Sequence, residues 1–301
     1  MSGPRLPGGR SLAVLRGRAT PAGDGSGRRR LARQPVGFWL AVLWLGALSF
    51  FVLLAPVLGF LADPEAYSRD VQQGVGWSHW FGTDELGRDM FARVVWGGRL
   101  SLMIAAISVA AGILIGGSMG LLAGFFGGWA DTLLSAVINV LLSLPALILA
   151  LFIVTVLAQN TRNVTIAVTI LAARAVARIV RAQTLRFRQR EFVTAARCMG
   201  ARTSRLIFRE VLPNLVPVVV AFAFLALGLV IVGEGSLSFI GKSVPAPAIT
   251  WGGILALAKG KLAAAPHLTI YPAVVMFCTL LAVNYIGDVL MRRFDVRQSL
   301  L

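Results

Sequence analysis

Residues 100–126 read LSLMIAAISVAAGILIGGSMGLLAGFF, an apolar stretch without any Asp, Glu, His, Lys or Arg. A helix needs about 20 such residues to cross the roughly 30 Å of hydrocarbon in a bilayer. An uncharged run of this length is typical of a membrane span. The stretch therefore predicts a transmembrane helix and, with it, an integral membrane protein.

The composition of the whole chain points the same way. Of its 301 residues, 57% are hydrophobic and 14% are charged, whereas globular proteins have about 50% and about 25%. The net charge is +16. An apolar excess combined with a basic excess favours a membrane protein with basic loops over a nucleic-acid-binding protein. The only two cysteines, Cys198 and Cys278, lie too far apart in the sequence to indicate a disulfide framework.

Five further stretches are long and apolar enough to span a membrane. With the first, the predicted spans are residues 37–61, 100–126, 132–158, 163–180, 211–233 and 268–290. The fourth is the weakest, because Arg174 and Arg178 lie inside it and have to protrude into water or snorkel. Prolines in three spans are expected to kink them: Pro145, Pro217 and Pro272. The predicted fold class is an all-α integral membrane protein with six transmembrane helices.

Most basic residues fall on one side of these spans. Of the 29 lysines and arginines, residues 1–36 carry eight, residues 174–209 carry ten and the C-terminal tail carries three. Because basic loops stay in the cytoplasm, both termini and the loop 181–210 are expected there. The loop 62–99, with six acidic residues, is expected outside. The tail 1–36 is expected to be disordered, with contact to anionic lipids as an alternative.

The predicted spans contain almost no charged side chains that could act in catalysis or ion coupling. Spans one, two, three and five have no Asp, Glu, His, Lys or Arg, and of these residue types the sixth has only Asp288. Ion-coupled transporters and intramembrane proteases need such groups near the midplane. Residues 235–243 resemble a phosphate-binding loop but have five residues between the glycines where four are required. We therefore expect no catalytic residue, metal or cofactor in this chain, and a driving force that comes from a partner.

The second span carries a ladder of glycines spaced by four residues. They are Gly112, Gly116, Gly120, Gly124 and Gly128. This spacing keeps them on one slowly drifting stripe of the helix, where a second backbone can approach closely. The stripe indicates helix packing within this subunit; a subunit interface or a wall of a translocation pathway is the alternative.

The cytoplasmic segment 191–213 predicts two short helices joined by a turn. The first runs to Gly200, a residue suited to a helix C-cap, and the second covers residues 204–211. Rigidly joined to two spans, such a pair is able to transmit force from a soluble partner. The alternative is an ordinary basic loop held near lipid.

This segment resembles the EAA motif of ABC-importer permeases. The matching residues are Glu191, Ala195, Ala196, Gly200, Ile207, Leu212 and Pro213. In that family the loop forms a coupling helix that docks on an ATPase subunit. The resemblance therefore implies an ATPase-coupling role for these residues, and a type I ABC-importer transmembrane domain over residues 37–301.

Further motifs resemble the dipeptide, oligopeptide and nickel group of these permeases. Within FGTDELGRD at 81–89, the outer-loop signature comprises Gly82, Thr83, Asp84, Gly87, Arg88 and Asp89. EGSLSFIG at 234–241 and WG at 251–252 resemble the last outer loop of that group. The motifs favour the C-type partner of a heteromeric permease pair. There are departures: Ala136 and Asn139 stand where the family usually has a charged pair, and Thr194 stands where Glu is common.

The resemblance implies a non-enzymatic permease subunit in a bacterial inner membrane that forms half of a pathway for di- or oligopeptides. Its implied partners are a homologous second permease, an extracytoplasmic substrate-binding protein, and two ATPase subunits or one fused ATPase that hold ATP and Mg. No nucleic acid is implied. The outer-loop signature is expected to shape the face near the binding protein. Nickel or another small solute is the alternative cargo, and a non-transport membrane scaffold is the distant alternative.

Overall fold

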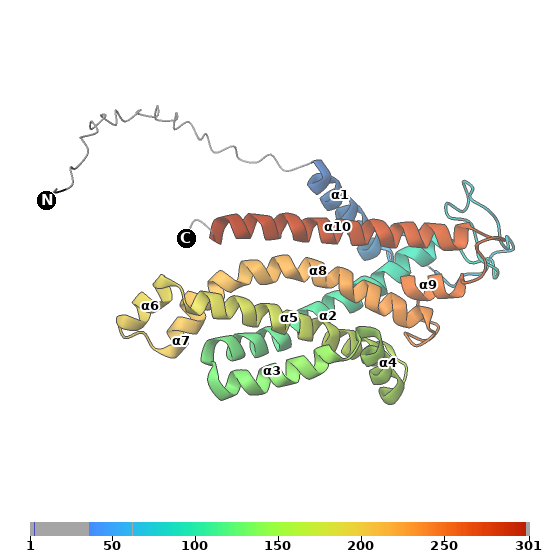
Figure 1. Cartoon of the computed structure of the whole chain (residues 1–301). Coiled ribbons are helices and arrows are strands. Elements are labelled where there is room, and N and C mark those ends of the chain that lie inside the picture. The colour runs from blue at the N-terminus through green and yellow to red at the C-terminus, as the bar shows by residue number, and fades with distance from the viewer. Residues whose placement is uncertain (1–2, 4–35, 62, 299–301) are drawn as a thin grey trace, which may run out of the picture. The chain divides into compact units, whose positions relative to one another are not determined.

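The computed structural model describes Gly3, residues 36–61 and residues 63–298. The expected disordered tail 1–36 therefore lies outside the described residues, apart from Gly3 and Val36. The regular structure of the described part is helical (Figure 1), with one isolated bridge between Thr83 and Asp89. The helices are α1 (Val36–Leu54), the 3-10 turn η1 (Gly59–Leu61), α2 (Met90–Phe126), α3 (Gly128–Ser143), α4 (Ala146–Leu157), α5 (Thr161–Arg188), α6 (Glu191–Cys198), α7 (Thr203–Arg205), the π-helical turn η2 (Leu206–Val211), α8 (Leu212–Phe239), α9 (Trp251–Leu257) and α10 (His267–Gln298).

In the described part of the chain, five helical stretches are long and apolar enough to cross a membrane. They are α1, α2, α5, Thr203–Phe239 and His267–Phe294. A sixth candidate consists of α3 and α4, which are bent by 92° at the break between them. The predicted class, an all-helical membrane protein, is confirmed, with five to six candidate spans.

Several helices continue beyond the expected spans. α2 starts ten residues before residue 100, and α5 runs on to Arg188. These extensions carry polar residues. The expected spans were bounded by apolar residues, whereas a helix continues as long as its backbone hydrogen bonds do. α1 is instead shorter than expected and ends at Leu54, because the residue before Pro56 is disfavoured in helical conformation.

The break between α3 and α4 falls at Leu144 and Pro145. Pro145 has no N–H to donate and its ring crowds the preceding turn, and at this position the helix breaks. α8 and α10, in contrast, run through Pro217 and Pro272 without interruption. The last carbonyls of α3 are left without partners inside the helix. Arg174 of α5 donates from Nη1 to two of them, Leu141 at 2.7 Å and Leu144 at 3.0 Å.

The closest helix contact in the described chain joins α2 to α5. A β-carbon added at Gly116 would lie 2.0 Å from the carbonyl oxygen of Ala173, and one at Gly120 would lie 2.4 Å from that of Ala177. Gly112 and Gly124 continue the contact with similar closeness. Residue numbers rise in the same direction on both helices, so α2 and α5 are parallel. Four of the five ladder glycines thus let two backbones touch within one subunit.

The fifth glycine, Gly128, does not take part in this contact, because it lies beyond the end of α2 at Phe126. It begins α3 at φ +57°, and no neighbouring atom lies within 4 Å of an added β-carbon. Gly127 before it has φ +68°. Two successive left-handed residues, which glycine adopts without steric cost, turn the chain from α2 into α3.

We expect Gly116→Ala to destabilise the fold by about 1–3 kcal/mol, because the added methyl group overpacks against backbone that cannot rotate away. The free energy of unfolding is measured by steric trapping of the purified protein in micelles. Gly117→Ala is the matched control: an added β-carbon there meets only Ile113 Cγ2, at 4.0 Å. Equal stability of the two variants would contradict the backbone contact.

Candidate functional site

The segment with the EAA resemblance forms a small subdomain at one end of the helices (Figure 1). α6 turns Val193 and Ala196 inward, where they pack in one cluster with Phe187, Leu206 and Ile207. The opposite face of α6 is exposed, and it carries Glu191, Thr194, Ala195 and Cys198. The apolar cluster therefore fixes one face of α6 and leaves the other face open.

Gly200 ends this helix in the left-handed conformation expected of a C-cap. Its φ is +80°, and its N–H donates to the carbonyl oxygen of Arg197 at 3.0 Å. The N–H of Ala201 then donates to the carbonyl oxygen of Ala196 at 3.1 Å. These bonds satisfy carbonyls that a helix end leaves free. The turn sets the direction in which the chain returns to the membrane.

The segment that follows Gly200 differs from the single helical stretch expected at residues 204–211. α7 is one turn, η2 is π-helical, and both run without a gap into α8. Ile207 is buried, Leu212 is half-buried, and Pro213 is exposed in the first turn of α8. Pro213 has no N–H to donate, and the turn before it is wound as a π-helix.

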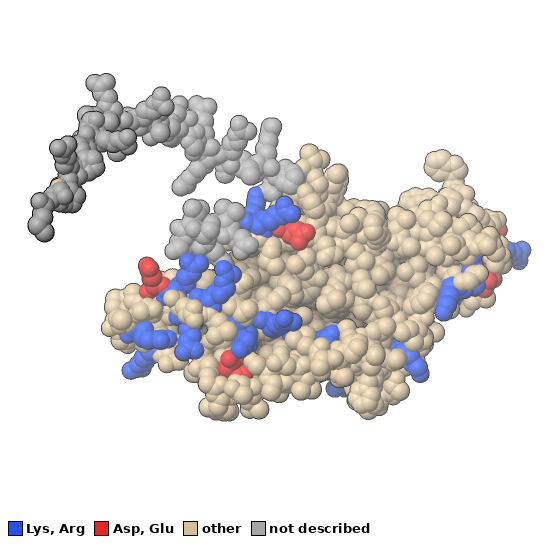
Figure 2. All heavy atoms as spheres, in the orientation of Figure 1, with Lys and Arg blue, Asp and Glu red and all other residues tan. Residues whose placement is uncertain are grey.

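Apolar and basic side chains are mixed on the exposed side of this subdomain. Met199 is 80% exposed and Phe208 is 65% exposed. Arg202, Arg205 and Arg209 are exposed beside them in the sequence, and Figure 2 shows lysine and arginine side chains gathered over the end formed by α6 and α7. Large exposed apolar side chains rimmed by charge are typical of a protein–protein interface.

α5 and α3 are tied together close to this subdomain. Arg181 of α5 donates from Nε and Nη2 to the two carboxylate oxygens of Asp131, at 2.6 and 2.8 Å. Ala136 and Asn139, which replace the usual charged pair of the family, are exposed on α3. The Asp131–Arg181 pair thus links the two helices without a charge at those positions.

The outer-loop signature folds tightly at the opposite end of the helices. Gly82 and Gly87 have φ of +74° and +72°. An added β-carbon would lie 2.5 Å from the carbonyl oxygen of Gln73 at Gly82, and 2.2 Å from that of Ser68 at Gly87. Thr83 is fully buried, and its hydroxyl accepts from the N–H of Gln73 and donates to the carbonyl oxygen of Asp70.

Two of the charged signature residues, Asp84 and Arg88, belong to a four-membered ion-pair network with Glu65 and Arg93. Arg88 donates to Asp84 at 2.7 Å and to Glu65 at 2.8 Å. Arg93 donates to the other oxygen of Glu65 at 2.7 Å and lies 3.9 Å from Asp84. Burial lowers the pKa of the Arg88 guanidinium, but its hydrogen bonds to Asp84 and Glu65 and the charge of both carboxylates outweigh burial, so the pKa is raised. The network holds Glu65, in the segment after η1, against the signature loop and the start of α2.

Glu65 and Arg93 were not among the residues expected at this site. Arg93 is only 4% exposed, and it stands in the first turn of α2, outside the motif. A sequence signal existed: a buried arginine needs a carboxylate partner, and the loop 62–99 has more acidic residues than arginines. Which carboxylate reaches it depends on loop geometry, which the motif does not contain.

Asp89, the last signature residue, caps α2. One carboxylate oxygen accepts from the N–H of Ala92 at 2.9 Å, and the other lies 2.8 Å from Nδ1 of His79. His267 at the start of α10 joins the same end, since its Nε2 lies 3.1 Å from the carbonyl oxygen of Thr83. Side-chain capping of this kind fixes where α2 begins.

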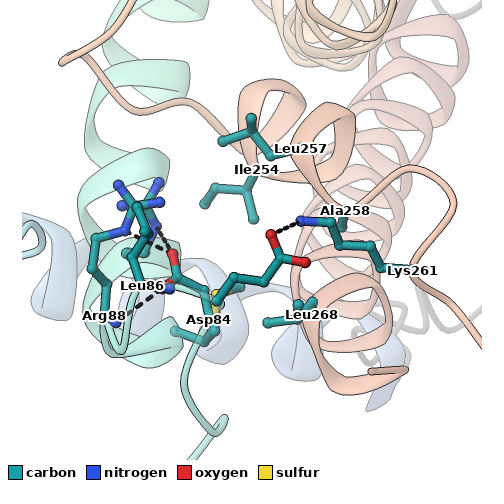
Figure 3. A pocket seen from close by; sticks show the side chains of 11 residues that line it. Asp84, Leu86, Arg88, Ile254, Leu257, Ala258, Lys261 and Leu268 are labelled. Carbon is teal, nitrogen blue, oxygen red and sulfur yellow. Dashed lines mark hydrogen bonds and ion pairs between the residues drawn. The ribbon is translucent and has the colours of Figure 1, made fainter. Parts of the chain in front are cut away.

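A pocket of about 230 Å³ lies between this loop and the segment from α9 to α10. In Figure 3, Asp84 and Arg88 face Lys261 across it, with Ile254 and Leu257 on the wall between them. Nζ of Lys261 forms an ion pair with Glu85 at 2.5 Å, which closes one side of the pocket. Residues 36–61 and 63–298 contain no group of three or more His, Cys, Asp or Glu side chains able to hold a metal.

The fold is that of a helical membrane domain with a small subdomain at one end of the helices and a structured loop at the other. The family described as "Binding-protein-dependent transport system inner membrane component" matches residues 112–299, and the chain belongs to that family. It is therefore a multi-pass inner-membrane permease component of an ABC transporter, which works with ATPase subunits and is not itself an enzyme. The expected permease resemblance is confirmed.

Curated relatives are similar over most of their length. The chain is 37% identical over 275 residues to the glutathione transport system permease protein GsiD of Pectobacterium atrosepticum, covering 89% of each chain. It is 34% identical over 263 residues to the dipeptide transport system permease protein DppC of Alkalihalophilus pseudofirmus, covering 86% of each. An inward-facing structure of the MetNI methionine ABC transporter has the same fold, with a TM-score of 0.58 and 21% identity over 68% of this chain and 97% of that one.

We expect Glu65→Gln to destabilise the protein by about 1–2 kcal/mol, because Arg93 loses its close carboxylate partner while it stays buried. The figure is at the lower end because Glu65 itself is partly exposed. The measurement is the free energy of unfolding in micelles. Glu85→Gln, which breaks an exposed ion pair in the same loop, should cost less than about 1 kcal/mol. A larger loss in Glu85→Gln than in Glu65→Gln would contradict the central place of Glu65.

Proposed function

We propose that this chain forms half of the translocation pathway of an importer for di- or oligopeptides. The supporting observation is its 34–37% identity, over nearly nine-tenths of the chain, to permeases of dipeptide and glutathione transport systems. Glutathione is itself a small peptide, so both relatives point to one chemical class of cargo. A homologous second permease would complete the pathway, and an extracytoplasmic binding protein would deliver the peptide to it.

The same proposal assigns the ATPase-coupling role to the segment from Glu191 to Pro213. The exposed face of α6 offers a shallow surface for an ATPase subunit, and its buried face is packed onto α5 and η2. Because α5 and α8 run directly out of this subdomain, displacement of α6 would pull on two membrane helices. ATP-driven closure of the ATPases would then switch the pathway between inward- and outward-facing states.

The coupling role implies that α6 faces the cytoplasm, together with both chain termini. The ten arginines between residues 174 and 209 support this orientation through the positive-inside rule. The signature loop 82–89 then lies on the outer face, where its ion-pair network gives a rigid surface to the binding protein.

The pair Ala195→Trp and Ala196→Trp tests the docking face. At the exposed Ala195 a bulky side chain should lower the amount of ATPase that co-purifies with the tagged permease by about tenfold or more, and leave the permease stable. At the buried Ala196 it should destabilise the permease itself, by about 1–3 kcal/mol. ATPase binding that is unaffected by Ala195→Trp would exclude this face as the docking site.

Replacement of Gly200 tests the turn. An added β-carbon there meets no neighbouring atom, so the constraint is the backbone conformation alone. Gly200→Val should abolish transport while the permease still inserts into the membrane, whereas Gly200→Asn should keep much of the activity because Asn tolerates left-handed φ. Uptake by whole cells and the amount of permease in membranes are measured together. Normal uptake by the Val variant at unchanged expression would refute the coupling role.

The cargo is identified by purifying the transporter with its binding protein and analysing the co-eluting ligand by mass spectrometry. Short peptides are expected. A co-eluting metal ion or other small solute, with no peptide, would overturn the proposed cargo and leave the permease role in place.

A further inference from the structure

A cavity of about 380 Å³ lies beside the first turns of α2 and has no part in the transport mechanism proposed above. Its lining includes Trp96 and Arg99 of α2, Glu65 of the segment after η1, and residues 247–249, which precede α9. Arg99 is the last charged residue before the uncharged run 100–126. Because such a run fills the hydrocarbon of the bilayer, the cavity lies at the depth of the lipid headgroups.

The side chain of Arg99 is exposed and stacked on an aromatic ring in this cavity. Its Cζ lies 5.2 Å from the ring centroid of Trp96. The ring is fixed in turn, because its Nε1 donates to the carbonyl oxygen of Leu61 at 2.7 Å. An aromatic face attracts and orients a guanidinium, but it does not cancel its charge.

The positive charge of Arg99 is not balanced by a neighbour. Within residues 36–61 and 63–298, no carboxylate forms an ion pair with it. Glu65, the acidic residue that lines the cavity, accepts Arg88 on one oxygen and Arg93 on the other. With Asp84 that network holds two carboxylates and two guanidiniums, so it is neutral. Arg99 therefore gives the cavity a net positive charge.

The helix face that continues from the cavity into the membrane is open and apolar. Exposed residues follow one another at spacings of four, four, three and four, which keeps them on one side of α2: Arg99, Met103, Ile107, Ala110 and Leu114. The exposed positions of α3, in contrast, include Thr132, Asn139 and Ser143. Polar side chains in a span face protein or water, whereas an apolar face suits lipid chains. The cavity is therefore continuous with a lipid-facing surface.

We propose that this cavity binds the headgroup of an anionic phospholipid, with Arg99 as the group that holds its phosphate. A guanidinium presents N–H donors in a planar fork that matches two phosphate oxygens. The acyl chains lie along Met103 and Ile107, and the headgroup fills the space between α2 and residues 247–249. The bound lipid thus joins the start of α2 to the segment that leads into α9.

The test measures the first lipid bound to the purified transporter complex, by native mass spectrometry. The probes are dioleoylphosphatidylglycerol, dioleoylglycerol, which has the same chains without the phosphate, and inorganic phosphate. Phosphatidylglycerol should bind about fivefold or more tightly than dioleoylglycerol, and an equal concentration of inorganic phosphate should leave it bound. Equal binding of the two lipids would overturn the phosphate site. Displacement by inorganic phosphate would identify a site for a soluble anion and overturn the lipid assignment.

Variants locate the site. Arg99→Gln should weaken the binding of phosphatidylglycerol about fivefold or more and leave that of dioleoylglycerol unchanged. Arg99→Lys, which keeps the charge and loses the planar fork, should have an intermediate affinity. Arg162→Gln is the matched control, because Arg162 is exposed in the first turn of α5 and does not line the cavity. Wild-type affinity in Arg99→Gln, or an equal loss in Arg162→Gln, would refute the site.

The same variant separates a lipid from a protein partner. An acidic residue of a second permease is the other group able to neutralise Arg99. For a lipid site, Arg99→Gln should co-purify with the second permease in the wild-type ratio while it loses phosphatidylglycerol. A loss of the second permease, with lipid binding unchanged, would overturn the proposal and assign this face to the contact between permeases.

Discussion

The close approach of α2 and α5 is the constraint on which the rest of the structure depends. At Gly116 and Gly120 the two backbones touch without any intervening side chain, so the helices cannot slide or separate without losing contact over several turns. α2 begins directly after the signature loop 82–89, and α5 ends just before α6 begins. One rigid pair therefore connects the face that would meet a binding protein with the face that would meet an ATPase.

The two ends of this pair are held in different ways. At the outer end, charges fix the loop: Arg88 and Arg93 share Glu65 and Asp84, and Asp89 caps α2. At the other end, an apolar cluster joins Phe125 at the end of α2 with α5, α6, η2 and Leu215 of α8. Because packed interiors transmit strain, a displacement of α6 has to move these side chains together or open a cavity between them. The cluster is thus suited to carry motion, and the ion-pair network to resist it.

Much of the fold was predictable because a bilayer imposes long apolar helices, and residues 100–126 alone reveal one. Helix ends were less predictable: α2 starts at Met90 because Asp89 caps it, a contact that depends on the folded loop. The spacing of four residues identifies the ladder glycines, but Gly128, which has the same spacing, belongs to α3 and not to α2. In the outer loop the motif contains Asp84 and Arg88, whereas Glu65 and Arg93 reach them only through tertiary folding. The role of Arg174 was likewise not predictable, because the carbonyls that it binds become free only where the chain bends between α3 and α4.

The distribution of ionisable groups in the helices suits a pathway whose energy comes from partner subunits and not from groups inside the membrane. Arg174 donates to free carbonyls at a helix break, and Arg181 pairs with Asp131 near the subdomain of α6 and α7. Each satisfies a structural need, and the described central turns of α2, α4 and α8 carry no charge at all. Such helices offer a polar solute no charged group that would bind it tightly between the two faces of the membrane. Recognition would then have to occur at the outer end of the pathway, and release would depend on helix motion imposed by the ATPases.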